Sequence, residues 1–146
     1  FRAATVQCKE PDIWGSAFAV FLGVADEKQA KSIATYFQHH YNEIVQKGQV
    51  RHLPGGVYWE KARERDKYQN GAFWATPTGW FVYTLDIVDP ELANQTIVDL
   101  VKDFKENVAN EWIFGTTYQL PNYLASAALP LEGIRSMVDR RRQPNN

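Results

Sequence analysis

The segment from Lys67 to Trp80 combines aromatic rings, the amides Gln69 and Asn70, and two glycines within fourteen residues. Flat rings stack on the C–H face of a pyranose, while amides and accessible backbone groups hydrogen-bond its hydroxyls. This composition is typical of a sugar-binding site. The same segment also fits an ordinary helix start, with Thr76 as the cap, Pro77 in the first helical position and the tryptophans in the core.

Further aromatic and amide side chains could contribute to the same site. The candidates for stacking on a sugar are Trp14, Trp59, Tyr68, Trp74, Trp80 and Trp112, and some of these rings are expected in the core instead. The candidates for contacts with sugar hydroxyls are Gln69 and Asn70, and more weakly Asn122 and Tyr123. The sequence therefore predicts a site that recognises a neutral, hydroxyl-rich ligand.

Three carboxylates lie beside these aromatic residues. Hydrolysis of a glycosidic bond requires two carboxyl groups, one that protonates the leaving oxygen and one that activates water or attacks the sugar. Glu111 precedes Trp112, Glu60 follows Trp59, and Asp12 lies two residues before Trp14. Asp12 also suits a helix N-cap or a hydroxyl acceptor, and each carboxylate alone fits a purely structural role equally well.

The overall charge argues against some classes of partner. Sixteen basic and seventeen acidic residues give a net charge of −1, so neither nucleic acid nor an anionic membrane is an expected partner. The longest apolar stretches are too short to span a membrane. The run Arg140–Arg142 is interpreted as part of a solvated tail at 139–146. The acceptor pattern at 94–96 slightly favours an extracellular protein.

Metal and cofactor chemistry is not expected either. His39 and His40 are adjacent and point apart on a helix, and His52 has no nearby sequence partner for a metal. Cys8 is the only cysteine, so it cannot form an internal disulfide. No glycine-rich phosphate loop is present, and no cofactor is predicted.

The apolar pattern predicts about five helices in alternating inner and outer positions. The segments 26–48 and 90–108 have one-sided apolar stripes, with caps at Asp26 and Asp89. The segments 15–24 and 79–88 are apolar almost throughout and predict inner helices. A third inner helix is expected at 122–138, with a kink or restart at Pro130. Long connections at 49–75 and 107–121 separate these units, and 50–59 has the composition of short strands.

Three strings in this arrangement resemble the C-terminal half of six-hairpin glycosidases. They are 11–17, Tyr68-Gln69-Asn70-Gly71-Ala72-Phe73-Trp74, and 111–115 followed by 120–123. The resemblance spans 11–137, although Ala72 stands where the family often has a second glycine. It implies an all-α fold, a partial α/α toroid with long loops and at most a short β-hairpin. Residues 1–146 would then be the C-terminal part of a larger domain.

The resemblance also implies a function. The chain would form part of an inverting glycoside hydrolase, with Glu111 as the general base and Glu60 as the second choice. The partner acid would lie in an N-terminal half of the barrel outside this chain, and the isolated chain would be inactive. The alternative is a non-catalytic helical module that binds glycans or a protein through the same loops.

Overall fold

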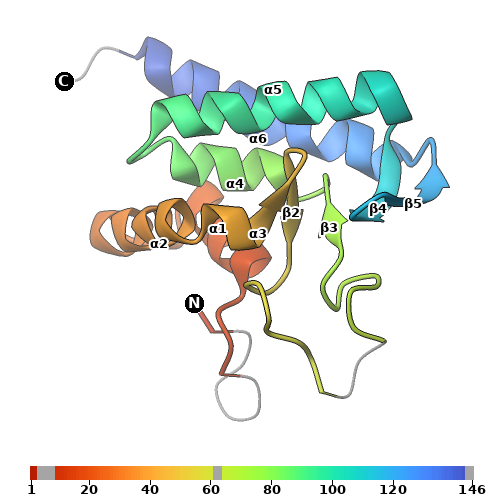
Figure 1. Ribbon diagram of the computed structural model, residues 1–146. Coiled ribbons are helices and arrows are strands. Elements are labelled where there is room, and N and C mark those ends of the chain that lie inside the picture. The colour runs from red at the N-terminus through yellow and green to blue at the C-terminus, as the bar shows by residue number, and fades with distance from the viewer. Residues whose placement is uncertain (3–8, 61–63, 144–146) are drawn as a thin grey trace.

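The computed structural model describes residues 1–2, 9–60 and 64–143, so Cys8 lies outside the described residues. Its helices are α1 (Ile13–Phe21), α2 (Glu27–His39), α3 (Tyr41–Ile44), α4 (Thr78–Leu85), α5 (Pro90–Asn107) and α6 (Leu124–Arg142). Its strands are β1 (Val45–Gln46), β2 (Gln49–Arg51), β3 (Phe73–Trp74), β4 (Asn110–Phe114) and β5 (Thr117–Pro121). Figure 1 shows the two described parts of the long loop, 52–60 and 64–72, extending from the strands away from α4, α5 and α6.

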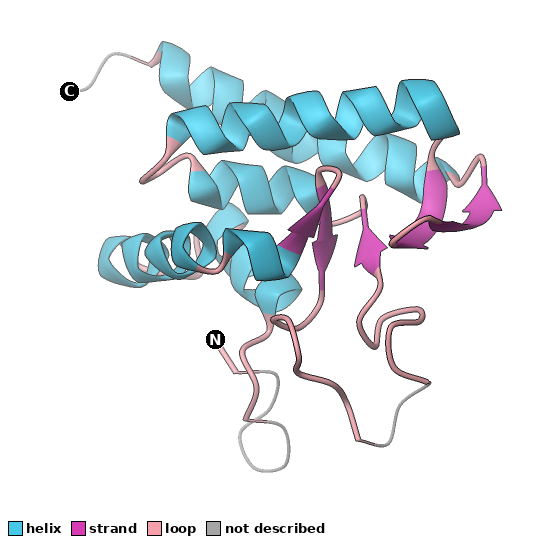
Figure 2. Ribbon diagram, viewed as in Figure 1, coloured by secondary structure: helices cyan, strands magenta, loops and turns pink. Residues whose placement is uncertain are grey.

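The strands form one antiparallel sheet in the order β1-β2-β3-β4-β5 (Figure 2). Val50 pairs with Trp74, and Phe73 pairs with Ile113, so strands from both long connections meet in this sheet. The prediction of an all-α fold is therefore wrong, and the chain is a mixed α and β structure rather than an α/α toroid. Two of the strands are only two residues long, which is too short to show a strand periodicity in the sequence.

The predicted caps at two helix starts are confirmed. The Asp26 side chain accepts a hydrogen bond from the Gln29 amide, and the Gln29 side chain accepts one from the Asp26 amide, which completes a capping box. Asp89 caps α5 by accepting from the Leu92 amide. Thr76 does not cap α4, because that helix begins after Pro77 and has no side-chain cap. The helix predicted over 26–48 ends earlier, and Gly48 lies in the turn between β1 and β2.

Helix α4 is the centre of the molecule. It packs against α1, α2, α5 and α6, and Phe81, Val82 and Leu85 are fully buried in the core. The prediction of an inner helix is thus confirmed for α4. It is wrong for α1, where Phe18 and the C-cap residue Leu22 are exposed. One face of α1 therefore packs against α4 while the other lies at the surface.

The close contact between α4 and α6 depends on two glycines. A Cβ atom added to Gly133 would lie 2.2 Å from the backbone carbon of Gly79, and one added to Gly79 would lie 2.4 Å from the Pro130 oxygen. Pro130 lies inside α6 without ending it. The helix continues to Arg142, so the tail predicted at 139–146 begins within a helix.

Three helices begin at the sheet. The Ile13 amide donates to the His52 carbonyl beside β2, and the Thr78 hydroxyl donates to the Gly48 carbonyl. The Tyr123 amide, just before α6, donates to the Ala109 carbonyl beside β4. The first turns of α1, α4 and α6 and the two long connections therefore lie at the same end of the molecule.

Candidate functional site

A cluster of aromatic rings lies where α1 and the long loop meet the sheet. We refer to it as the aromatic cluster, and its members are Trp14, His52, Trp59, Tyr68, Trp74 and Tyr123. Trp14 stacks on His52 with ring centroids 4.5 Å apart, and Trp74 meets Trp14 edge-on at 5.7 Å. The structure thus brings four of the predicted stacking residues together from three separate segments.

The central rings of the aromatic cluster are structural. Trp74 is 4% exposed, and its indole nitrogen donates to the Tyr68 carbonyl at 3.2 Å. The Trp14 indole donates to the Val50 carbonyl at the same distance. Because indole N–H groups away from water need a partner, these contacts hold the buried Trp74 and the half-buried Trp14 in place. The buried Trp74 ring presents no open face for a sugar in this arrangement.

Asp12 joins α1 to the long loop. Its carboxylate accepts from the Gly15 amide at 2.8 Å and lies 3.2 Å from His52 Nε2. Burial raises the pKa of Asp12, but the hydrogen bonds from His52 and Gly15 and the charge of His52 outweigh burial, so the net pKa is lowered. This carboxyl is therefore held in its ionised form as a helix cap.

Asn70 and Gly71 hold the loop in a compact form. The Asn70 side chain is buried, accepting from the Trp59 amide at 2.7 Å and donating to the Trp59 carbonyl at 3.3 Å. Gly71 has φ of 121°, and an added Cβ would lie 2.9 Å from the Arg51 guanidinium. The amide that we predicted to bind sugar hydroxyls therefore clamps the loop, while its neighbour Gln69 is exposed.

An open hollow lies between the loop and the β4–β5 hairpin. It has a volume of about 420 Å³ and is lined by Arg65, Asp66, Lys67, Trp112, Phe114, Thr117 and Gln119. A second hollow of about 370 Å³ shares Lys67 and Trp112 and adds Glu64 and Tyr68. We call the two together the Trp112 groove. It contains two of the predicted stacking residues, Tyr68 and Trp112.

The hairpin presents alternate residues to this groove. Trp112 pairs with Gln119 and Phe114 pairs with Thr117, so these four side chains share one face of the hairpin. Side chains alternate along a strand, which puts Glu111 on the opposite face with Ile113. The first-choice catalytic residue thus does not line the Trp112 groove. Glu60 is exposed and does not line it either, so the groove does not bring the two predicted catalytic residues together.

Several residues of the groove were not predicted. Arg65, Asp66 and Lys67 look like an ordinary charged loop in the sequence, and nothing in that run indicates that it faces a hairpin. The spacing of two residues between Trp112 and Phe114, and again between Thr117 and Gln119, is the signal that could have identified this face. His52 was considered only as a metal ligand, whereas the structure stacks it on Trp14.

In the described part of the chain, no group of three or more His, Cys, Asp or Glu side chains could hold a metal ion. No helix in the same ranges is long and apolar enough to cross a membrane.

No family model, curated protein or solved structure matches this chain.

Proposed function

We propose that this chain binds carbohydrate in the Trp112 groove as part of a glycoside hydrolase. The observation that carries the proposal is the position of Trp112, which lines both hollows of the groove. Tyr68 lines the smaller hollow with it, and the polar Thr117 and Gln119 line the larger one. Aromatic rings supply stacking faces, and the hydroxyl and amide groups supply hydrogen bonds in both directions. The hollow volume of about 420 Å³ falls within the range of small-ligand sites.

The second part of the proposal is that the bound sugar is hydrolysed. Glu64 borders the groove, but the hydrogen bond from Lys67 lowers its pKa, and a general acid needs a raised one. We therefore keep Glu111, which directly precedes the groove residue Trp112 in the sequence, as the proposed general base. The partner acid would come from a part of the protein outside this chain. Since Glu111 lies on the other face of β4, the sugar would have to extend around the edge of the groove.

A non-catalytic carbohydrate-binding module is the second candidate. It is favoured by the absence of Glu111 and Glu60 from the lining of the groove. Under this alternative the groove residues bind the same ligand, and no carboxylate needs to reach a glycosidic bond. The two candidates therefore share a binding prediction and differ only in turnover.

Calorimetric titration with a panel of neutral and acidic oligosaccharides tests the binding. Trp112→Ala should weaken binding about tenfold through the loss of its stacking face. The control is Phe18→Ala, which truncates an exposed ring on α1 and should leave the affinity unchanged. Unchanged binding by Trp112→Ala, or no binding by the unmodified chain, would show that the proposal is wrong.

Turnover separates the two candidates. In the complete enzyme, Glu111→Gln should abolish release of reducing ends while sugar binding survives. Normal turnover by this variant would remove Glu111 from the catalytic role. If the unmodified protein binds sugar and never hydrolyses any member of the panel, the non-catalytic module is the correct candidate.

A further inference from the structure

The guanidinium of Arg51 lies buried behind the Trp112 groove with unused hydrogen-bonding capacity. Arg51 is 6% exposed, and its Nε and Nη2 atoms have no hydrogen-bond partner among the residues that the structure describes. Its guanidinium carbon lies 5.3 Å from the centre of the Phe73 ring and 5.7 Å from that of Tyr58. The carboxylate paired with it is that of Asp66, at 3.7 Å from Nη2, which is beyond hydrogen-bond distance. A buried arginine in this state stabilises an additional anion nearby.

The Asp66 carboxylate contacts both Arg51 and the Tyr58 hydroxyl. Its Oδ1 atom accepts from the Tyr58 hydroxyl at 2.6 Å and is the same atom that faces Arg51. Asp66 also lines the groove, so Arg51 lies one carboxylate away from the space that a ligand would occupy. The negative charge of Asp66 only partly compensates the cations around it.

The mouth of the groove adds further positive charge. Arg65 stacks on Tyr58 at 5.0 Å, and it forms no ion pair with any carboxylate in the described part of the chain. Lys67 pairs with Glu64 at the exposed rim. Among the described residues, two cations, Arg65 and Lys67, line the groove together with the two carboxylates of Glu64 and Asp66. Arg51, which lies next to Asp66, makes the cations the majority. This local excess contrasts with the net charge of −1 for the whole chain.

We infer that the Trp112 groove selects an acidic oligosaccharide that carries uronic acid carboxylates. This inference rests on the proposed function and narrows its substrate class. The sugar ring stacks on Trp112, and its carboxylate accepts hydrogen bonds from Arg65 and Lys67. A planar guanidinium matches a carboxylate in two parallel hydrogen bonds, which favours a carboxylate over a neutral hydroxymethyl group. Arg51, behind Asp66, adds to the positive potential at the same position.

The test compares tetragalacturonate with its methyl ester, which has the same sugar rings without the charge. In calorimetry at low salt, the acid should bind the unmodified chain about tenfold more tightly than the ester, and added salt should reduce that difference. Arg65→Gln should lower the affinity for the acid to that for the ester. The matched control is Arg135→Gln, an exposed arginine on α6 outside the groove, which should change neither affinity.

Asp66→Asn should raise the affinity for the acid, whereas a folding defect would lower it. The asparagine keeps an oxygen for the Tyr58 hydroxyl and removes the charge that partly compensates Arg51. Affinity for tetragalacturonate should therefore rise several-fold, while affinity for the ester stays unchanged. Equal or tighter binding of the ester by the unmodified chain would overturn the inference and leave carbohydrate binding intact. If neither compound nor any neutral oligosaccharide binds, the proposed function falls as well.

Discussion

At the scale of single residues, the Asp12 carboxylate connects two segments through its charge. It caps α1 at the Gly15 amide and lies 3.2 Å from His52, which in turn stacks on Trp14. An ionised carboxylate accepts both contacts more strongly than a protonated one. The protonation state of Asp12 therefore affects the junction between the helix and the long loop.

The lowered pKa of Asp12 predicts a loss of stability in acid. Its folded pKa lies below the ordinary value of 3.8 for a free aspartate side chain. The stabilisation is therefore present above that value and is lost as pH falls through the folded pKa. Urea midpoints measured at pH 6, 4 and 3 should fall toward low pH. Asp12→Asn keeps a capping side chain without the charge and should show a smaller fall over the same interval. Identical pH profiles for both proteins would contradict this account.

The residues of the site show what composition can and cannot predict. Trp74 and Asn70 belong to the segment that the sequence identified as sugar-binding, and both are buried in structural contacts. Composition predicts that aromatic and amide groups gather, but it does not indicate which face of a ring is covered. Trp112 and Tyr68 line a hollow because the β4–β5 hairpin and the long loop lie next to each other there.

At the scale of elements, the helices were predictable and the sheet was not. The caps at Asp26 and Asp89 and the apolar stripes set most helix starts locally. Strands β1 and β3 have two residues each, and β3 pairs with β2 and β4, which are far from it in the chain. Such pairing depends on tertiary packing, which a local pattern does not contain.

The crossing of α4 and α6 yields a prediction at this scale. Gly133→Ala places a methyl group 2.2 Å from the Gly79 backbone, so the two helices must move apart. Overpacking of this kind costs about 1–3 kcal/mol or more, which outweighs the roughly 1 kcal/mol that alanine gains over glycine inside a helix. Thermal unfolding should show a clear drop in Tm. Glu132→Ala, next to it on an exposed position, is the control and should change Tm little. An unchanged Tm for Gly133→Ala would show that the crossing tolerates separation.

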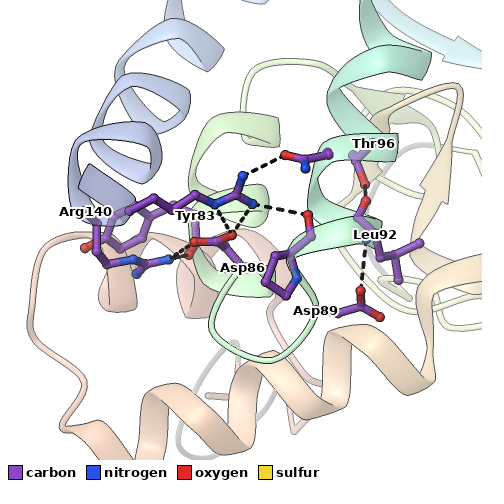
Figure 3. A network of polar contacts seen from close by, with 9 residues as sticks. Tyr83, Asp86, Asp89, Leu92, Thr96 and Arg140 are labelled. Carbon is purple, nitrogen blue, oxygen red and sulfur yellow. Dashed lines mark hydrogen bonds and ion pairs between the residues drawn. The ribbon is translucent and has the colours of Figure 1, made fainter. Parts of the chain in front are cut away.

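At the scale of the whole molecule, the two ends carry different groups of side chains. The first turns of α1, α4 and α6 meet the sheet and the long loop, which form the aromatic cluster and the Trp112 groove. Figure 3 shows a polar network at the other end, where the last turn of α6 meets α4 and the start of α5. Asp86, buried at the end of α4, binds Arg140 and Arg141 from α6.

This network also reaches α5. Arg140 donates to the Tyr83 carbonyl at 2.7 Å, and Arg141 donates to the Asn94 side chain at 2.9 Å and to the Pro90 carbonyl at 3.2 Å. The two arginines that the sequence assigned to a solvated tail therefore link three helices. Their side chains are each 33% exposed, so water can partly replace a lost partner.

Removal of the Asp86 charge should loosen the end of α6 as well as lower stability. Asp86→Asn keeps the size of the side chain but leaves two arginines without their counter-charge, and we expect a loss of about 1–3 kcal/mol after allowance for solvent. Hydrogen exchange should rise over 134–142, because the contacts that hold the last turns of α6 to α4 are weakened. Asp139→Asn is the matched control, since its carboxylate is 59% exposed and pairs with Arg142 on the same helix. Equal protection of 134–142 in both variants would mean that the Gly79–Gly133 crossing alone holds α6 in place, and that the arginines are dispensable for the packing of this end.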